Sequence, residues 1–283
     1  MEAAKVGQAL AYLRRRYQLT QRQVAEYLGV SDKAVSKWER GAGTPDISLL
    51  GRLAMLLDTD IESILDGNIT SLDVSWQGVL YLARVTGVET DAKLYDKPAA
   101  YLPLSYLMLA GIRDIEIMGG EAALASLRGR LGDGHSLGLC LTYTEQTGAW
   151  TEERGRAQLA ARLEQTTKKG RRIDGIMLVD RLSFVYGKDL TKAFRRILYS
   201  QQISVQLLSH AGLPLGIHFL RRGQRGEQPL ALERGTCAFP IVDAASLRDA
   251  GELMRIIESR QQEQIADLAE VARSRWFIDA EEK

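Results

Sequence analysis

The sequence predicts an all-α domain over residues 1–68 and an α/β domain over residues 72–283 whose sheet is mostly parallel. In the first part, apolar residues recur at helical spacing and are separated by capping and turn residues. In the second part, short apolar runs alternate with helical segments, which is the order of a parallel sheet covered by helices on both faces. A polar stretch at residues 66–71 is predicted to link the two domains.

The composition is that of a globular protein without a dominant charge. Its 283 residues are 45% hydrophobic and 26% charged, with a formal net charge of +1, which is an ordinary balance for a water-soluble chain. The most apolar run, residues 99–112, is too short to span a bilayer, and Met1 leads into an amphipathic helix rather than a secretory signal. We expect a cytoplasmic protein without membrane association.

Neither the cysteines nor the histidines form a metal-binding pattern. Cys140 and Cys237 lie far apart and outside any CxxC motif, which favours a reducing compartment and argues against structural zinc. His135, His210 and His218 are scattered without ligand spacing, so we expect surface or core histidines. We therefore predict no metal ion and no cofactor.

Capping residues define the helices of the first domain. Thr20 and Gln23 have the spacing of a capping box, and Gly29 permits the left-handed conformation that ends a helix. Ser31 is a predicted N-cap, and Gly41 with the turn residues that follow stops the next helix. The predicted helices begin near residue 6 and then span residues 21–28, 32–40, 46–57 and 60–65.

Two short helices joined by a tight turn containing glycine, with a third behind them, form a helix-turn-helix unit. The sequences LTQRQVAEYLGVS at residues 19–31 and VSKWERG at residues 35–41 closely resemble the Cro/repressor-like (XRE) family, over about the first quarter of the chain. Basic residues crowd this part of the chain and supply the local positive potential that phosphate contacts need: Arg14, Arg15, Arg16, Arg22, Lys33, Lys37 and Arg40.

The resemblance implies that the second helix of the motif lies in the major groove of DNA. We therefore predict that Lys33, Ala34, Ser36 and Lys37 face base edges or flanking phosphates, and that Gln21 donates to a phosphate at the preceding helix N-terminus. The apolar positions of the motif are predicted core, and Glu39 with Arg40 is assigned to a stabilising ion pair; the core set is Val24, Ala25, Leu28, Val30, Val35 and Trp38. The alternative is a helical protein-interaction bundle that does not bind DNA.

The second domain alternates between segments with the periodicity of a strand and segments with the periodicity of a helix. The predicted strands span residues 78–83, 114–118, 138–143, 175–179 and 205–208. The predicted helices span residues 99–110, 121–131, 154–166, 190–199, 246–260 and 264–273.

Several segments of this domain are similar in sequence and order to sugar-phosphate nucleotidylyltransferases, especially glucose-1-phosphate thymidylyltransferase. They are YDKP (95–98), YLPLS (101–105), LMLAGIRDI (107–115), LGDG (131–134), YGKDL (186–190), IESRQ (257–261) and WFIDA (276–280). The resemblance spans essentially residues 76–280 and implies a Rossmann-like fold with a nucleotide pocket.

The residues that bind phosphate and Mg²⁺ in this family are not all present in this sequence. Its glycine-rich phosphate loop of the form GGxGTR, followed by a catalytic lysine, corresponds here to ARVTGVETDAK at residues 83–93, which has one glycine and two carboxylates. The family holds Mg²⁺ with two aspartates; Asp180 lies near the first position, but Pro240 occupies the second. The resemblance implies two candidate ligand-binding residues: Gln146, as a glutamine that contacts the base, and Asp180. It implies no catalytic residue.

These observations predict a transcription regulator that binds double-stranded DNA and carries a catalytically inactive nucleotidylyltransferase-like domain. That domain is expected to sense a nucleotide, a nucleotide sugar or a sugar phosphate, or to assemble the protein into a homodimer or higher oligomer. The alternative is an active sugar-phosphate nucleotidylyltransferase that autoregulates its own expression.

Overall fold

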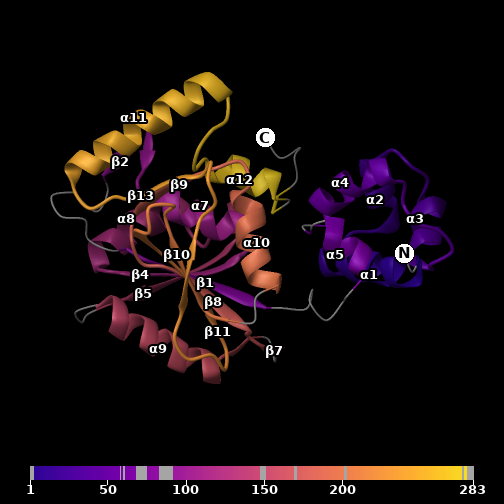
Figure 1. Cartoon of the computed structure of the whole chain (residues 1–283), viewed down its shortest axis with the longest axis horizontal. Coiled ribbons are helices and arrows are strands. Elements are labelled where there is room, and N and C mark those ends of the chain that lie inside the picture. The colour runs from indigo at the N-terminus through magenta and orange to yellow at the C-terminus, as the bar shows by residue number, and fades with distance from the viewer. Residues whose placement is uncertain are drawn as a thin grey trace. The chain divides into compact units, whose positions relative to one another are not determined.

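A computed structural model describes residues 3–57, 59, 61–67, 75–82, 92–146, 151–168, 171–200, 203–275 and 277–278. The chain separates into two compact units, Met1–Val74 and Ser75–Lys283, and each is described by itself (Figure 1). Most of the predicted linker and residues 83–91 of the loop compared with the phosphate-binding segment lie outside the described residues. Within the described part, no helix is long and apolar enough to cross a membrane.

The described residues of the first unit form the helices α1 (Ala3–Arg16), α2 (Gln21–Leu28), α3 (Asp32–Glu39), α4 (Ile47–Leu56) and α5 (Ile61–Asp66). The predicted caps of α2 are confirmed, because Thr20 and Gln23 form a capping box and Gly29 adopts φ 71°. Ser31 caps α3 by accepting from the Ala34 backbone N–H. These helices therefore begin and end where local hydrogen bonding dictates.

The apolar faces of these helices meet in one core. Its buried residues include Val6, Leu10, Leu13, Val24, Leu28, Val35, Trp38, Leu50, Leu53, Leu57 and Ile64. Gly7 allows α1 to approach α3 closely, since a Cβ at this position would collide with the carbonyl oxygen of Trp38. The predicted core is confirmed except at Val30, which is only half-buried because it follows the end of α2.

The second unit is built on a seven-stranded sheet in the order β12-β10-β11-β8-β1-β4-β5. Strands β8, β1, β4 and β5 are parallel neighbours, while β11 runs antiparallel to both β8 and β10. The mostly parallel α/β sheet is thus confirmed. The strands are β1 (Trp76–Tyr81), β4 (Asp114–Gly119), β5 (Cys140–Glu145), β8 (Gly175–Val179), β10 (Val205–Leu208), β11 (Pro214–Arg221) and β12 (Gln228–Ala231).

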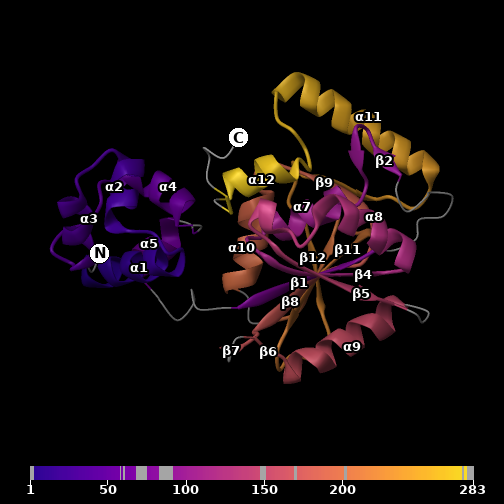
Figure 2. The ribbon, with the colours of Figure 1, turned by 180° about the vertical axis from the view of Figure 1, so that it is seen from behind.

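Helices cover both faces of this sheet (Figure 2). On one face, α9 (Glu152–Gln165) packs over a small apolar cluster that includes Leu159 and Leu163. The opposite face carries the larger core, under α7 (Tyr101–Leu109), α8 (Glu121–Leu131), α10 (Leu190–Ser200) and α12 (Leu268–Ser274). The longest helix, α11 (Ala244–Gln261), contacts the hairpin of β2 (Lys93–Leu94) and β3 (Lys97–Pro98).

Element boundaries differ from the sequence prediction where turns intervene. Strand β5 begins at Cys140 because residues 135–137 form a 3₁₀ turn and Gly138 has φ 64°. Helix α12 begins at Leu268, since Ala266 has φ 54° and Asp267 supplies the N-cap. The short strands were not predicted: β2, β3, β6 (Thr167–Lys168), β7 (Arg171–Arg172), β9 (Ser183–Tyr186) and β13 (Cys237–Pro240), together with β11 and β12 of the main sheet.

Candidate functional site

The candidate DNA-binding surface is the outer face of α3. Lys33 and Lys37 are exposed, while Ala34 and Ser36 are half-buried beside them. The Lys37 side chain lies against the turn after the helix, where a Cβ added to Gly43 would be 3.3 Å from its Cε. Four of the predicted contact residues, Lys33, Ala34, Ser36 and Lys37, therefore lie on α3, whereas Gln21 lies at the start of α2.

Glu39 fixes α3 relative to α1 and α2. The Arg14 guanidinium donates to both carboxylate oxygens of Glu39, over 2.5 and 2.9 Å, and the Gln21 amide nitrogen donates to the second over 2.8 Å. Arg14 also donates to the carbonyl of Leu19, just before α2, over 2.7 Å. Partial burial favours the neutral acid, but the hydrogen bonds from Arg14 and Gln21 outweigh it and hold the pKa of Glu39 below its ordinary value.

This network modifies two predictions. The ion pair assigned to Glu39 exists, but its partner is Arg14; Arg40 instead donates to the carbonyl of Ser36 within its own helix. Gln21 was expected to donate to phosphate, and its amide nitrogen here donates to Glu39. Because an amide nitrogen has two N–H groups, the phosphate contact stays a prediction.

The second candidate site is the edge of the sheet where the parallel strands end. Asp180 follows β8, and Gln146 follows β5 with its backbone N–H donating to Gly119 over 2.9 Å. Two strands, β1 and β4, separate β8 from β5, so the two residues lie about 14 Å apart across the sheet. The structure places both at the same edge but does not bring them into contact.

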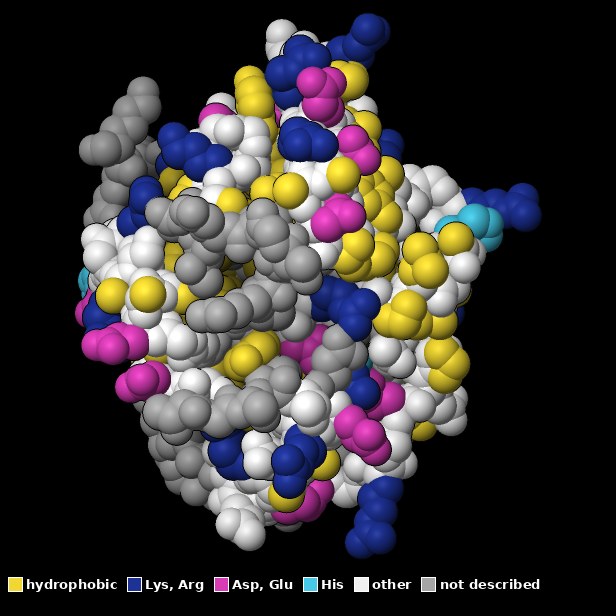
Figure 3. Space-filling model, turned by 90° about the vertical axis from the view of Figure 1, so that its left-hand side faces the viewer, with side chains coloured by type: hydrophobic (Ala, Val, Ile, Leu, Met, Phe, Trp, Pro, Cys, Tyr) yellow, Lys and Arg dark blue, Asp and Glu magenta, His cyan; other side chains and the backbone are white. Residues whose placement is uncertain are grey.

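Figure 3 views the left-hand side of Figure 1, on which β4, β5 and α8 lie. Acidic and basic side chains are interspersed over the described surface on this side, without a large field of one sign. The surface charge therefore does not by itself select an anionic ligand.

Asp180 belongs to a buried cluster that sequence reasoning missed. Its carboxylate is fully buried, with Oδ1 3.4 Å from Nε2 of the equally buried His218. No donor among the described residues is aligned with either oxygen of Asp180. On the other side of the ring, Nδ1 of His218 lies 2.6 Å from Oε2 of Glu227.

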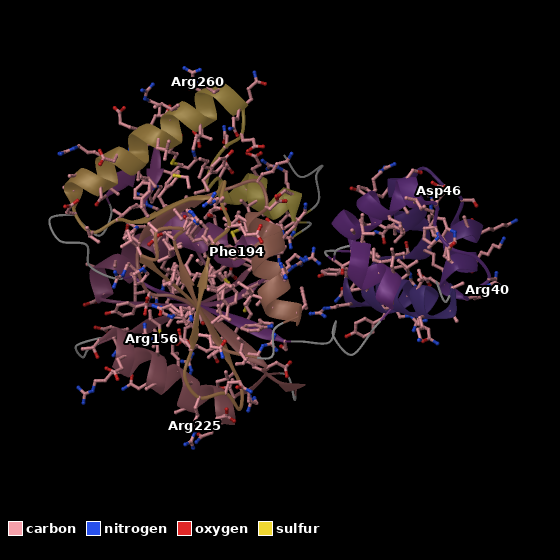
Figure 4. All side chains as sticks on the ribbon, in the orientation of Figure 1. Arg40, Asp46, Arg156, Phe194, Arg225 and Arg260 are labelled. Carbon is pink, nitrogen blue, oxygen red and sulfur yellow. The ribbon has the colours of Figure 1, made fainter. Side chains whose placement is uncertain are left out.

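Arg156 of α9, which is labelled in Figure 4, completes this cluster. Arg156 Nη1 lies 3.4 Å from His218 Nε2, and Arg156 Nε lies 3.5 Å from Glu227 Oε1. The four side chains come from α9, the end of β8, β11 and the loop before β12. Asp180 follows a predicted strand, whereas β11, which carries His218, was not predicted, and nothing local links either residue to Glu227 or Arg156.

The charges of the cluster decide the state of His218. Burial favours the neutral imidazole, but the carboxylates of Asp180 and Glu227 outweigh it and raise the pKa of His218 above its ordinary value. His218 is buried, whereas His135 and His210 are exposed.

The residues at Asp180 do not fit the magnesium ion that the fold family implies. Among the described residues, no three His, Cys, Asp or Glu side chains are arranged so that they could hold a metal ion. A single carboxylate is a poor Mg²⁺ site, and the neighbours of Asp180 are an imidazole and, beyond it, a guanidinium. The guanidinium opposes a divalent cation nearby.

A second charge pair, in which Glu116 is buried and Arg162 is partly exposed, lies on the same sheet face. Arg162 of α9 donates to the two carboxylate oxygens of Glu116 on β4, over 3.2 and 2.6 Å, and Thr144 donates to Glu116 over 2.8 Å. This pair holds α9 to the middle of the sheet and contacts none of the candidate ligand residues.

Comparison with known proteins defines the class of each unit. The helix-turn-helix family (HTH_3) matches residues 10–64, the segment that carries α2 and α3. The chain thus has an N-terminal helix-turn-helix domain of the XRE type, followed by a nucleotidyltransferase-like domain similar to glucose-1-phosphate thymidylyltransferase.

Particular relatives support the second assignment. Glucose-1-phosphate thymidylyltransferase from Mycolicibacterium smegmatis is 28% identical over 243 residues, covering 66% of this chain and 81% of the relative. The Neisseria meningitidis enzyme of the same name is 49% identical over 53 residues, which is 19% of this chain and only 18% of the relative.

A solved structure agrees in fold. A crystal structure from Bacillus anthracis, described under the name glucose-1-phosphate thymidylyltransferase in complex with sucrose, aligns with a TM-score of 0.51 at 11% identity. The alignment covers 64% of this chain and 96% of that chain. At this identity, the likeness shows a shared fold.

Proposed function

We propose that the protein is a sequence-specific transcription regulator that binds double-stranded DNA through α3. The observation that carries this proposal is the rigid presentation of Lys33 and Lys37 on a helix whose base is fixed by Arg14, Gln21 and Glu39. A recognition helix must be held in one orientation to read base edges, while its lysines contribute phosphate affinity.

Selection of bound sequences from a random DNA library tests this function. We expect one recurrent motif, bound much more tightly than unrelated DNA of equal length at the same salt concentration. Equal affinity for all sequences would overturn sequence-specific recognition, and absence of DNA binding would favour the protein-interaction bundle.

For the second domain, we propose a non-catalytic sensor or assembly role. The support is the cluster at Asp180, whose neighbours are His218 and Arg156, together with Pro240 at the place where the family has its second aspartate. The fold nevertheless supports an effector such as a nucleotide, a nucleotide sugar or a sugar phosphate, because parallel α/β sheets bind ligands beyond the carboxyl ends of their strands.

Thermal unfolding with a panel of thymidine and uridine nucleotides, their sugars and glucose 1-phosphate tests the sensor role. A ligand at about one hundred times its Kd stabilises the native protein by roughly 2.7 kcal/mol. A shift that also changes DNA affinity would establish a sensor, whereas no shift with any of these compounds would leave assembly as the role.

An active transferase that autoregulates its own expression is the second candidate function. It is favoured by the 28% identity to a thymidylyltransferase over 243 residues. A pyrophosphate-release assay with thymidine triphosphate and glucose 1-phosphate distinguishes the two functions. We expect no turnover; turnover that Asp180→Asn abolishes would establish the enzyme instead.

A further inference from the structure

The longest helix of the second unit, α11, buries little of its own surface. Of its 18 residues, all of which are described, only Ala250 and Met254 are buried. Figures 1 and 2 both draw the helix at the rim of this unit, with no other described helix or strand of the unit on its outer side. Ile256 is 41% exposed, and Val242, which precedes the N-cap of the helix, is 52% exposed. Large apolar side chains that gather in water mark a surface for a partner.

Five residues on one flank of α11 recur at the spacing of a helix–helix seam. Ser246, Asp249, Leu253, Ile256 and Arg260 follow one another at intervals of three, four, three and four positions. Alternating steps of three and four keep side chains in line along a helix that packs against another helix. All five are exposed or half-buried, so they are accessible to a partner. We refer to these five residues as the α11 seam.

The chemistry of the α11 seam is complementary to itself when the direction of the helix is reversed. Leu253 and Ile256 form its apolar centre, Asp249 lies four positions before Leu253, and Arg260 lies four positions after Ile256. Two such seams that pack antiparallel place each carboxylate opposite a guanidinium and each central apolar residue opposite another. A parallel arrangement would instead place like charges opposite each other, which is unfavourable. Charge complementarity therefore selects a second, antiparallel copy of the same helix.

We infer that the α11 seam is an interface between two copies of this chain, whose α11 helices pack antiparallel about a twofold axis. Leu253 of one copy then packs against Ile256 of the other, and Asp249 of each copy faces Arg260 of the other. Such a contact is isologous, so it closes at the dimer. The inference rests on the proposed assembly role of the second domain and names the surface that carries it.

The opposite flank of α11 holds the helix to its own domain. Lys97 of the β2–β3 hairpin donates to Glu258 over 3.0 Å, and both side chains are largely buried. The same carboxylate oxygen of Glu258 accepts from the backbone N–H of Ile265 over 2.8 Å. Glu258 is two positions from both Ile256 and Arg260, so it lies on the other side of the helix. These contacts fix α11 while leaving the seam open, which lowers the entropy lost on association.

Charge reversal in the full chain tests the pairing of Asp249 with Arg260. Sedimentation equilibrium at low salt measures the dimer dissociation constant. Asp249→Arg and Arg260→Asp should each raise it by about tenfold or more, because each dimer then contains two like-charged contacts. The double variant Asp249→Arg/Arg260→Asp should restore the wild-type value to within about threefold, since the opposite charges face each other again. A double variant no tighter than the single variants would overturn the antiparallel pairing.

Arg248→Glu is the matched control, because it reverses an exposed charge of the same helix outside the seam. It should leave the dimer dissociation constant unchanged, and an increase as large as that of Arg260→Asp would contradict a specific contact. Thermal unfolding of each variant shows that it is folded, so that a loss of dimer is not a loss of structure.

Ile256→Lys tests the apolar centre of the seam. The position is already 41% exposed, so a lysine reaches water in a folded single copy but is buried between two copies, and the dimer should dissociate. A dimer as tight as the wild type would overturn the inference. If the wild type and every variant are dimers of equal affinity, the assembly role survives and the α11 interface fails. If the wild type is itself a monomer at micromolar concentration, both fail.

Discussion

At the scale of single residues, the first domain depends on Glu39. Its carboxylate accepts from Arg14 and Gln21, and these three residues belong to α3, α1 and α2. The side chains of Arg14 and Glu39 are only 13% and 7% exposed, so the pair is shielded from solvent screening. Such a pair fixes geometry, because a charge left without its partner is costly.

Glu39→Gln should destabilise the first domain by about 2 kcal/mol, since the Arg14 guanidinium loses its counter-charge while remaining partly buried. Calorimetric unfolding measures the loss. The exposed Arg22–Glu26 pair is the control, with side chains 82% and 61% exposed, and Arg22→Gln should leave the stability nearly unchanged, because solvent screens such a pair. Similar losses in both variants would show that the network around Glu39 contributes no more to stability than an exposed ion pair.

Lys37→Ala should weaken binding to specific and unrelated DNA to similar extents, because an exposed lysine on α3 acts mainly on phosphate. Titrations at several salt concentrations should show the slope of log K against log salt reduced by about 0.9. A loss confined to the specific sequence, with an unchanged slope, would instead assign Lys37 to base contacts.

His218 makes the stability of the second domain depend on pH. Its pKa is raised in the folded state, so folding favours the protonated ring. This stabilisation is complete below pH 6.5, the ordinary value of the group, and is lost as the pH rises through the raised value. Urea midpoints measured from pH 6 to 9 should fall in the wild type more than in His218→Gln; parallel curves would contradict this.

At the scale of elements, α2 shows how far local sequence fixes structure. A capping box begins it and a left-handed glycine ends it, and both could be predicted from residue types alone. Gly29 has φ 71° with open space around its Cβ position, so a side chain there meets backbone strain rather than a steric neighbour.

Gly29→Ala should therefore destabilise the first domain by about 1 kcal/mol, the cost of holding a residue with a Cβ in the left-handed region. Gly51→Ala is the matched control, because Gly51 lies within α4, also in open space but without a positive φ. It should stabilise the domain by about 0.5–1 kcal/mol. Thermal unfolding measures both, and a shift of the same sign would contradict the argument.

For helix α9, in contrast, the local sequence predicts the helix but not the contacts that its side chains make. Its sequence is strongly polar, yet Arg156 and Arg162 turn inward to buried acids on the sheet side. Its C-terminal end is held by Arg222, which donates to the carbonyls of Glu164, Thr166 and Ile173 over 2.5, 2.6 and 2.7 Å. Helical spacing predicts this helix but not its charged docking face, because its partners come from distant strands.

At the scale of the whole molecule, a helix-turn-helix regulator is expected to bind as a symmetric dimer. The protein should behave as a dimer or higher oligomer in light scattering at micromolar concentration. Its DNA motif should contain two inverted half-sites, separated by about one helical turn. Disruption of one half-site should weaken binding strongly; a monomer that binds a single half-site with full affinity would contradict the prediction.

The sequence by itself determined both fold classes and most elements of regular structure, because periodicity and caps act within a few residues along the chain. The positions of the α3 lysines followed from the same local signals. Tertiary structure alone decided the partner of Glu39, the antiparallel insertion of β11, and the cluster of Asp180, His218, Glu227 and Arg156. The pairs Arg14–Glu39 and Arg156–Glu227 join residues 25 and 71 positions apart along the chain. Local sequence patterns do not predict pairings over such separations.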